Sequence, residues 1–339
     1  MANRVVLGFS GGMDSVTAAQ LLRNNGYDVM ALTLDTVGDK FVIEAARQRA
    51  IQLGIPFEIL DVSSEFTSRI IDYFSNSYVS GRTPAPCTLC NPLIKWNYLL
   101  QRADAIGADY VATGHYFRVE RYNNRYYVAK AADAVKDQSY YLWGLGQNVL
   151  SRVLTPMSDV IKSDIKHNFS GSRESMGLCF LQGRSYREFL SERTPGLVQK
   201  GDIVDLNGRI VGRHDGVAFY TIGQKRGLDV EISGVAVVGI NAERNELIVG
   251  PQEQLFYAIL EVDNCNIVDE HELLSANDIS VVVRGIGRNP QGFARIIERN
   301  GSGYKIYLSD PAWAPAVGQP LVFYRQNRVV GGGIVEAYG

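Results

Sequence analysis

The feature that most constrains the fold is a glycine-rich turn near the start of the chain, Phe-Ser-Gly-Gly-Met-Asp-Ser at residues 9–15. The apolar run 5–7 precedes this turn, and a helix-like run at 16–23 follows it. Glycine lets the backbone approach an anion closely, and the N–H groups and dipole at a helix start favour negative charge. A strand, a glycine turn and a helix start in this order therefore predict a phosphate-binding loop.

The order of residues in this turn separates it from other phosphate-binding loops. A Walker loop ends in Gly-Lys-Ser/Thr, and that ending is absent here. The segment 10–15 instead resembles the PP-loop of ATP pyrophosphatases, which adenylate a substrate and release pyrophosphate. The alternative is structural, because Gly-Gly is also suited to a tight turn and Asp-Ser to a helix cap.

Length and composition set the broad class. The 339 residues suggest two or three domains, and 46% hydrophobic with 21% charged residues is typical of a globular protein with ample core. A net charge of −2 does not point to a nucleic-acid partner, so local patches must carry any such binding. We expect no membrane contact and a cytoplasmic location, because no apolar run has the length of a membrane helix and no signal peptide is evident.

The hydrophobic pattern divides the chain. Up to about residue 113 strands alternate with helices, which predicts a parallel sheet with helices on both faces and ligands beyond the carboxyl ends of the strands. The expected strands are 4–9, 28–33, 57–62 and 110–113, and the expected helices are 15–24, 40–53, 65–80 and 95–106. After about residue 195 short strands dominate, including one expected at 218–222, with hairpin turns at 207–208, 300–301 and 326–327.

Four cysteines are present, and in a cytosolic chain they are more often reactive, metal-binding or buried than disulfide-bonded. Cys87 and Cys90 form a Cys-x-x-Cys in a Pro-rich loop before an expected helix, and a helix dipole stabilises a thiolate at a helix N-terminus. The pair suits redox chemistry or half of a zinc site, but a second Cys-x-x-Cys is missing. Cys179 alone would most often be a core thiol, and Cys265, in an expected strand, is assigned to packing.

Two further segments bear polar groups near the expected nucleotide site. Residues 113–116, Thr-Gly-His-Tyr, follow a buried strand, and His115 is either a functional group or a hydrogen-bonded loop histidine. Residues 136–141, Lys-Asp-Gln-Ser-Tyr-Tyr, suit a phosphate backbone and a base, or else form a helix start capped by Asp137.

Taken in order along the chain, these segments resemble the bacterial tRNA-uridine 2-sulfurtransferases, or 2-thiouridylases, of the MnmA type. The resemblance covers nearly the whole chain. It rests on the segments 10–15, 81–84, 113–116, 136–141, 177–180, 221–228 and 331–334. It implies an α/β fold with an N-terminal parallel-sheet PP-loop domain of the adenine nucleotide alpha hydrolase type (1–195), a small central β-rich domain (196–254) and a C-terminal β-barrel (255–339).

The resemblance also implies an activity, ATP-dependent 2-thiolation of the wobble uridine in tRNAs for Lys, Glu and Gln. Adenylation of the uracil 2-oxygen makes AMP the leaving group, and a sulfur nucleophile then attacks carbon 2. The implied ATP-site residues are Gly8, Phe9, Ser10, Gly11, Gly12, Met13, Asp14, Ser15, Leu34 and Gly114, with Mg²⁺ on Asp14. The implied tRNA contacts are Ala85, Pro86, Cys87, His115, Lys136, Asp137, Gln138 and Gln319.

By the same resemblance, Cys179 receives a persulfide and Cys90 is the nucleophile that frees its sulfur or resolves the resulting disulfide. A sulfur-relay protein or a cysteine desulfurase is the implied donor. The family loop commonly has Asp where this chain has Cys87, so three thiols could share one site. Three thiolates with an open iron position suit a [4Fe–4S] cluster that carries sulfide, and this alternative stays open.

Other departures weaken the tRNA assignment in the barrel. Ile286 and Gly287 replace the usual Arg-Tyr contact, and Arg284 and Arg288 are candidates to contact phosphate instead. The segment 170–176 is shorter than usual before Cys179. The competing hypotheses are another PP-loop adenylating ligase, with no essential cysteine, and a tRNA-binding module that does not turn over ATP.

Overall fold

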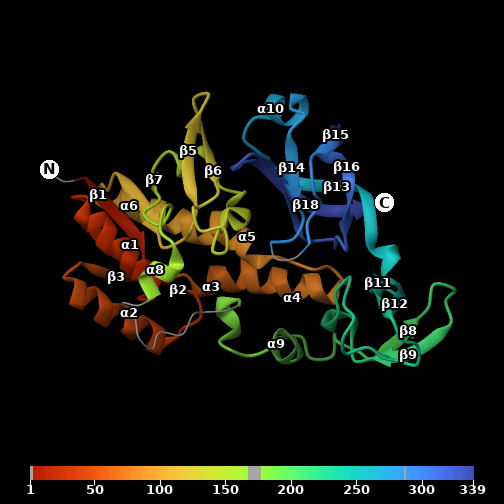
Figure 1. The fold of residues 1–339 in the computed structure, drawn as a ribbon. Helices are drawn as coiled ribbons and strands as arrows, with labels where there is room; N and C mark the ends of the chain where they lie inside the picture. Colours follow the sequence, from red (N-terminus) through yellow and green to blue (C-terminus); the bar gives the residue numbers. More distant parts are fainter. Residues whose placement is uncertain (1–2, 167–176, 286–287) are drawn as a thin grey trace. The chain divides into compact units, whose positions relative to one another are not determined.

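The computed structural model describes residues 3–166, 177–285 and 288–339 (Figure 1). These residues form two compact units, each described by itself. The first comprises Met1–Ile70, Cys87–Met176 and Asn327–Gly331, and the second comprises Ile71–Pro86, Gly177–Gln326 and Gly332–Gly339. Among the described residues, no helix combines the length and the apolar character that a bilayer crossing requires.

A five-stranded parallel sheet is the centre of the first unit, as the alternating pattern predicted. Its strand order is β3-β2-β1-β4-β7. The strands are β1 (Arg4–Gly8), β2 (Asp28–Asp35), β3 (Phe57–Asp61), β4 (Tyr110–Thr113) and the short β7 (Val153–Leu154). Val5, Val6 and Leu7 are fully buried, which is why β1 reads as a continuous apolar run rather than an alternating one.

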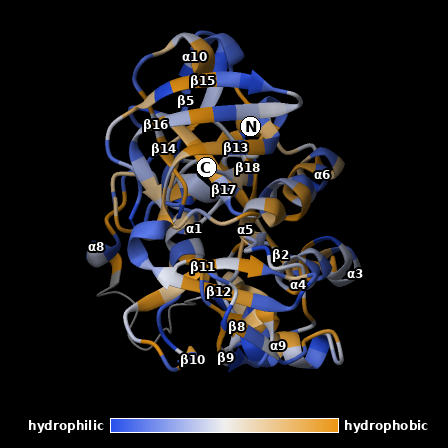
Figure 2. Cartoon of the chain, turned by 90° about the vertical axis from the view of Figure 1, so that its right-hand side faces the viewer, coloured by the Kyte–Doolittle hydropathy of each residue, from blue (hydrophilic) through white to orange (hydrophobic). Residues whose placement is uncertain are grey.

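Three helices connect and cover these strands: α1 (Met13–Asn24), α2 (Lys40–Leu53) and α6 (Trp96–Ile106). The predicted bounds of α2 are confirmed, because Asp39 caps its first turn and Gly54 ends it in the left-handed conformation. Right-handed crossovers place α1 and α2 on one face of the sheet and α6 on the other. Apolar and polar residues are both present along each helix, as α6 illustrates in Figure 2.

Two predicted helices are longer and less regular than expected. The one at 65–80 is α3 (Ser63–Phe66), a π-helical turn η1 (Thr67–Ile71) and α4 (Asp72–Val79). The one at 95–106 begins nine residues earlier, as α5 (Pro86–Cys90) and a second π turn η2 (Asn91–Lys95) that run into α6. The sequence placed its start too late because Pro92 normally ends a helix. Here the Asn91 side chain donates to the Cys87 carbonyl at 3.0 Å within the same turn.

The remainder of the first unit contains elements that the sequence pattern did not indicate. A hairpin joins β5 (Arg118–Tyr122) to β6 (Arg125–Ala129), and both turn residues, Asn123 and Asn124, have positive φ. β6 pairs with Arg328, the first residue of β18 (Arg328–Tyr338). The short helices are η3 (Ser139–Leu142), α7 (Gln147–Leu150) and α8 (Lys162–Lys166).

In the second unit, residues 201–251 form a small sheet with the order β10-β9-β8-β12-β11. The strands are β8 (Gly201–Val204), β9 (Ile210–His214), β10 (Asp229–Val230), β11 (Val235–Asn241) and β12 (Glu246–Pro251). The hairpin at 207–208 is confirmed between β8 and β9. The strand predicted at 218–222 is wrong, because 3₁₀ helix η5 (Val217–Phe219) lies there and a short buried apolar run fits either structure.

The remaining strands make the C-terminal antiparallel β domain, with the order β14-β17-β18-β13-β16-β15. They are β13 (Phe256–Ile267), β14 (Ile279–Val282), β15 (Ala294–Asn300), β16 (Gly303–Trp313), β17 (Pro320–Arg325) and β18. The hairpin between β15 and β16 at residues 300–301 is confirmed. The second unit also contains the short helices η4 (Cys179–Leu181), α9 (Tyr186–Arg193), η6 (Gln252–Leu255) and α10 (Glu270–Ser275).

Candidate active site

The parallel sheet brings the predicted nucleotide-binding residues of the first unit to one edge. Gly8, the last residue of β1, is in register with Leu32 in β2 and with Thr113, the last residue of β4. The glycine loop therefore leaves the sheet beside the end of β2, where Leu34 lies, and beside Gly114. This is the strand edge at which parallel α/β sheets bind ligands.

Two glycines are sterically required in the loop. Gly11 has φ +72°, and a Cβ there would lie 2.6 Å from the Cα of Ala46 in α2. A Cβ on Gly114 would lie 2.8 Å from both the carbonyl carbon of Asp14 and the amide nitrogen of Ser15. These approaches leave no room for side chains, so the backbone itself forms the wall of the loop.

The start of α1 presents its polar groups toward the loop. Its N-cap residue, Gly12, makes no capping hydrogen bond through a side chain. The Ser15 hydroxyl donates to the Gly12 carbonyl at 2.9 Å, and the hydroxyl oxygens of Ser10 and Ser15 are 3.3 Å apart. The neighbouring side chains of Phe9 and Met13 are buried, and they anchor the loop to the core. A helix start that lacks its own cap is suited to receiving a phosphate.

Asp14, the predicted Mg²⁺ ligand, has two partners in the first unit. Lys162 of α8 forms an ion pair with Asp14 Oδ1, and the Tyr116 hydroxyl donates to the same oxygen at 2.9 Å. The Asp14 side chain is 37% exposed, whereas that of Lys162 is 6% exposed. Sequence reasoning missed Lys162, because it belongs to no motif and lies 148 residues from its partner.

The residues at this edge fit a magnesium–nucleotide complex. The uncapped helix start supplies N–H groups, and Ser10 and Ser15 supply hydroxyls. Both kinds of group are donors suited to phosphate oxygens. The accessible carboxylate of Asp14 is the oxygen ligand that Mg²⁺ prefers. Lys162 adds a positive charge at the same point.

His115 follows Gly114 and is held on both ring nitrogens. The Lys95 ammonium donates to Nε2 at 3.1 Å, so the ring proton is on Nδ1, which donates to the Thr113 hydroxyl at 2.7 Å. Burial, followed by the positive charge of Lys95, lowers the pKa of His115 well below its usual value. The ring is therefore neutral at pH 7.

The lowered pKa of His115 predicts how stability depends on pH. The unfolded chain binds a proton below about pH 6.5 that the folded ring does not accept, so this contribution is complete above that pH and is lost as the pH falls. We expect the free energy of unfolding to fall by about 1 kcal/mol more in the parent protein than in His115→Gln between pH 7.5 and 5.5. Urea unfolding measures this difference, and equal pH dependence in the two proteins would contradict it.

The predicted tRNA-binding segment 136–138 braces the loop at Tyr116. The Gln138 side chain accepts from the Tyr116 amide at 2.9 Å, and the Gln138 amide donates to the Tyr116 carbonyl at 2.8 Å. Asp137 accepts from the Ala131 amide at 2.8 Å and from the Ser139 hydroxyl at 2.6 Å. Asp137 and Gln138 therefore hold the segment beside the predicted nucleotide site, with Lys136 just before them.

All four cysteines are thiols in the structure. Cys87 is exposed and Cys90 is half-buried, both in the first turns of the long helix that begins with α5, directly after Ala85 and Pro86. Their spacing of three residues puts both thiols on one helix face. Asn91 fixes this turn by donating to the carbonyls of Cys87 and Tyr141, each at 3.0 Å. Burial, and then the nearby Cys87, raises the pKa of Tyr141.

Cys179 belongs to the second unit, where it begins η4 with an exposed side chain. The next residue, Phe180, is buried and packs against Phe74 and Phe189, with ring centroids 5.1 and 5.2 Å apart. The backbone beside the thiol is therefore anchored while the thiol remains accessible. Cys265 differs, because burial raises its pKa to about 11.

Among the predicted barrel contacts, Gln319 is partly buried. Its backbone carbonyl accepts a hydrogen bond from the Val335 amide at 2.8 Å. The Arg284 guanidinium lies over the Trp313 ring at 5.2 Å, and that of Arg288 over Phe256 at 5.0 Å. Ile286, Gly287 and the shortened segment 170–176 lie outside the described residues.

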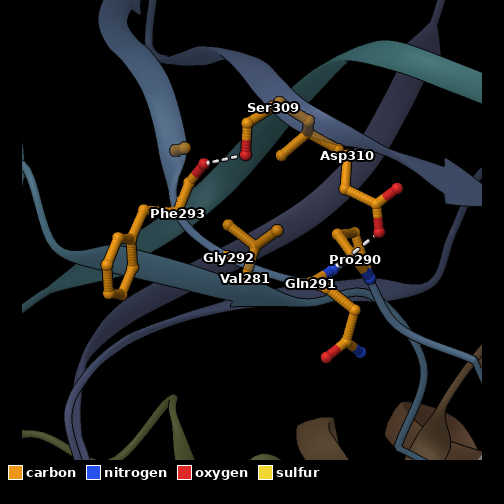
Figure 3. Close-up of a pocket in the computed structure, with 9 residues that line it drawn as sticks. Val281, Pro290, Gln291, Gly292, Phe293, Ser309 and Asp310 are labelled. Atoms are coloured by element: carbon orange, nitrogen blue, oxygen red, sulfur yellow. Dashed lines mark hydrogen bonds between the residues drawn. The ribbon is translucent and has the colours of Figure 1, made fainter.

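A shallow hollow in the C-terminal domain lies between β14, β16 and the loop before β15 (Figure 3). Two hydrogen bonds tie this loop to β16: Ser309 donates to the Phe293 carbonyl at 2.7 Å, and the Gln291 amide donates to Asp310 at 2.8 Å. None of the predicted site residues lines the hollow.

Comparisons with known proteins span nearly the whole chain. A model of the tRNA methyl transferase HUP domain matches residues 3–183, and a model of the tRNA methyl transferase PRC-barrel domain matches residues 187–251. A protein of Desulforudis audaxviator named tRNA-specific 2-thiouridylase MnmA is 40% identical, with 98% of each chain covered. A relative of the same name from Cytophaga hutchinsonii is 37% identical, with 98% of this chain and 97% of the relative covered. The tRNA-specific 2-thiouridylase MnmA 1 of Bacteroides fragilis is 37% identical, with the same coverage.

Proposed function

The chain belongs to the MnmA family of tRNA-specific 2-thiouridylases, and on this premise we propose that it thiolates the wobble uridine of tRNAs for Lys, Glu and Gln by transferring sulfur from a cysteine persulfide. It is an ATP-using enzyme that modifies tRNA. We expect it to act in the cytoplasm, where tRNA is modified. The observation that carries the proposal is the tight glycine loop, backed by Gly114 at the strand ends, in a chain that also exposes Cys87 and Cys179.

In the ATP half of the reaction, the uracil 2-oxygen attacks the α-phosphorus and pyrophosphate leaves. The residues at Gly8–Ser15, with Leu34 and Gly114, would hold the nucleotide, and Asp14 would hold Mg²⁺, which supplies charge neutralisation for the pyrophosphate when bound. The start of α1, whose N-cap residue Gly12 makes no side-chain capping bond, and the hydroxyls of Ser10 and Ser15 support this assignment.

In the sulfur half, Cys179 carries a persulfide supplied by a sulfur-relay protein or a cysteine desulfurase. The terminal sulfur attacks carbon 2 of the adenylated uracil, and AMP leaves. Cys90 then attacks the Cys179 sulfur, which releases the 2-thiouridine and leaves a Cys90–Cys179 disulfide. A dithiol reductant must restore both thiols before the next cycle.

The tRNA contacts proposed for this chain are Ala85, Pro86, Cys87, His115, Lys136, Asp137, Gln138 and Gln319. A flipped uracil needs shape and hydrogen-bonding groups rather than a duplex groove. The fixed turn at Asn91, which places Cys87 beside Tyr141, supports a base site near Cys87. Both ring nitrogens of His115 are engaged, by Lys95 and by Thr113, so its proposed tRNA contact requires that a base or ribose replaces one of these partners.

A second mechanism is favoured by one observation, the shared helix face of Cys87 and Cys90. Two thiols on one helix face, of which that of Cys87 is exposed, fit two ligand positions of a [4Fe–4S] cluster once they are deprotonated. Cys87, Cys90 and Cys179 would be its three cysteine ligands, and the cluster would supply a labile sulfide in place of the persulfide. In this mechanism Cys87 is a ligand, whereas in the persulfide mechanism it contacts the target base.

The two mechanisms differ in their response to Cys87→Asp, which restores the residue typical of the family. With persulfide transfer, we expect Cys87→Asp to keep thiolation within about threefold of the parent in air, because aspartate serves the other family members. With a cluster, Cys87→Asp should lose iron and sulfide in anaerobic preparations and lose activity with them. Thiolation of unmodified tRNA with ATP and a sulfur source, run aerobically and anaerobically, measures this. Absence of thiolation by the parent under both conditions would refute the proposed function.

A further inference from the structure

We infer that Lys162 is a phosphate-binding group of the nucleotide site, held on Asp14 until the nucleotide arrives. The inference deepens the proposed function and rests on the ATP use within it. It concerns only residues of the first unit, and it needs no tRNA and no sulfur.

The burial of Lys162 is the first observation. Lysine is almost never fully buried unless it is paired, because removing an ammonium from water is costly. The Lys162 side chain is only 6% exposed, and its ammonium is paired with Asp14 in the first turn of α1. The partner carboxylate is 37% exposed, so a ligand can reach it from solvent. The exposure of one partner adds no stability to a purely structural ion pair. A ligand, by contrast, can bind only to a carboxylate that solvent reaches.

The position of Lys162 is fixed from its own backbone. The Asp133 carboxylate accepts from the Lys162 amide at 2.9 Å and from the amides of Val135 and Lys136. These hydrogen bonds lower the pKa of Asp133, and the bond from the Lys162 amide has the largest effect. The lysine ammonium lies 5.8 Å from the centre of the Tyr116 ring, which Gln138 clamps in turn. A lysine fixed at its backbone, with a flexible stem, can exchange partners without rearranging the fold.

The chemistry of the exchange follows from charge. Asp14 carries one negative charge, whereas the phosphate chain of ATP carries three to four. A Mg²⁺ ion bound with the nucleotide prefers the carboxylate oxygen of Asp14. The displaced ammonium of Lys162 then has phosphate oxygens as its nearest strong acceptors, and lysine is a common phosphate-binding residue. The group that neutralises Asp14 in the free protein would thereby stabilise the leaving pyrophosphate.

The competing interpretation is a purely structural pair. If Lys162 only stiffened the start of α1, its loss would weaken every ligand of the site, including adenosine, which has no phosphate. If Lys162 binds phosphate, its loss weakens ATP and pyrophosphate and spares adenosine. The two interpretations therefore differ in which ligands are affected, not in whether the protein is weakened.

The experiment measures equilibrium binding without tRNA. Calorimetry with a non-hydrolysable ATP analogue and with pyrophosphate, and ligand-observed NMR with adenosine, compare the parent, Lys162→Met, Lys162→Arg and the matched control Lys130→Met, an exposed lysine at the end of the β5–β6 hairpin. For Lys162→Met in Mg²⁺ we expect a loss of about 10- to 100-fold for the ATP analogue and pyrophosphate, corresponding to one charge-assisted contact. Adenosine binding should be unchanged, Lys162→Arg should recover part of the affinity, and Lys130→Met should match the parent.

A second variant should not lose affinity for the ATP analogue as Lys162→Met does. In EDTA, Asp14→Asn removes a repulsive carboxylate and releases Lys162, so binding of the ATP analogue should be equal or tighter, while Lys162→Met binds more weakly. Unchanged ATP affinity in Lys162→Met, or an equal loss for adenosine, overturns the inference. Because no tRNA is present, the inference can fail while thiolation stands. Thiolation can equally be absent while nucleotide binding behaves as described.

Discussion

Replacing Cys179 with serine is expected to abolish tRNA thiolation while ATP is still cleaved to AMP and pyrophosphate. A serine hydroxyl cannot form a persulfide, so sulfur transfer should fall by roughly a thousandfold or more, as it does when a nucleophile is removed. The residues proposed to bind ATP belong to the first unit and Cys179 to the second, so Cys179→Ser leaves all of the proposed ATP-site residues in place. Mass spectrometry of 2-thiouridine and a pyrophosphate-release assay measure the two halves separately.

Two variants make this prediction specific. Cys265→Ser is the matched control, because burial raises the pKa of that thiol to about 11, where it is a poor nucleophile at neutral pH. It should keep full thiolation. Cys90→Ser should accept sulfur on Cys179 but fail to complete turnover. Full thiolation by Cys179→Ser would show that another group carries the sulfur.

The parts of the fold that the sequence predicts well are those with local signals. The bounds of α2 follow from Asp39 and Gly54, which act within one turn of their own helix. The hairpins at 207–208 and 300–301 follow from Asn-Gly pairs. The start of the long helix at Pro86 could not be predicted in this way, because a side-chain bond from Asn91 offsets the effect of Pro92.

The candidate site shows the same division. The glycine loop was assigned from a motif, Leu34 and Gly114 were assigned from the family resemblance, and the strand register brings them to one edge. Lys162 lies on a five-residue helix that no periodicity reveals, and only the tertiary fold brings it to Asp14. Lys95, which holds the ring of His115 neutral, was likewise seen only as a helix residue. Contacts between distant segments are the part that a single sequence does not encode locally.

Gly11→Ala is expected to remove nucleotide binding and to lower the free energy of unfolding by about 2–4 kcal/mol. The φ of +72° costs an alanine about 1–2 kcal/mol, and its Cβ would lie 2.6 Å from the Cα of Ala46. Backbone on both sides must move, so the loop and the start of α1 separate from α2. Calorimetry with an ATP analogue and urea unfolding measure the two effects.

The matched control is Gly26→Ala, at the end of α1 in the same unit. Gly26 has φ +84°, but a Cβ there would meet no atom within 4 Å. Its substitution therefore carries the strain of the left-handed conformation alone, about 1–2 kcal/mol, and should leave ATP affinity unchanged. If both variants lost equal stability and both bound ATP like the parent, close packing of Gly11 on α2 would not be what shapes the loop. If only Gly11→Ala lost binding, the backbone approach between Gly11 and Ala46 would be established as the feature that forms the phosphate cradle.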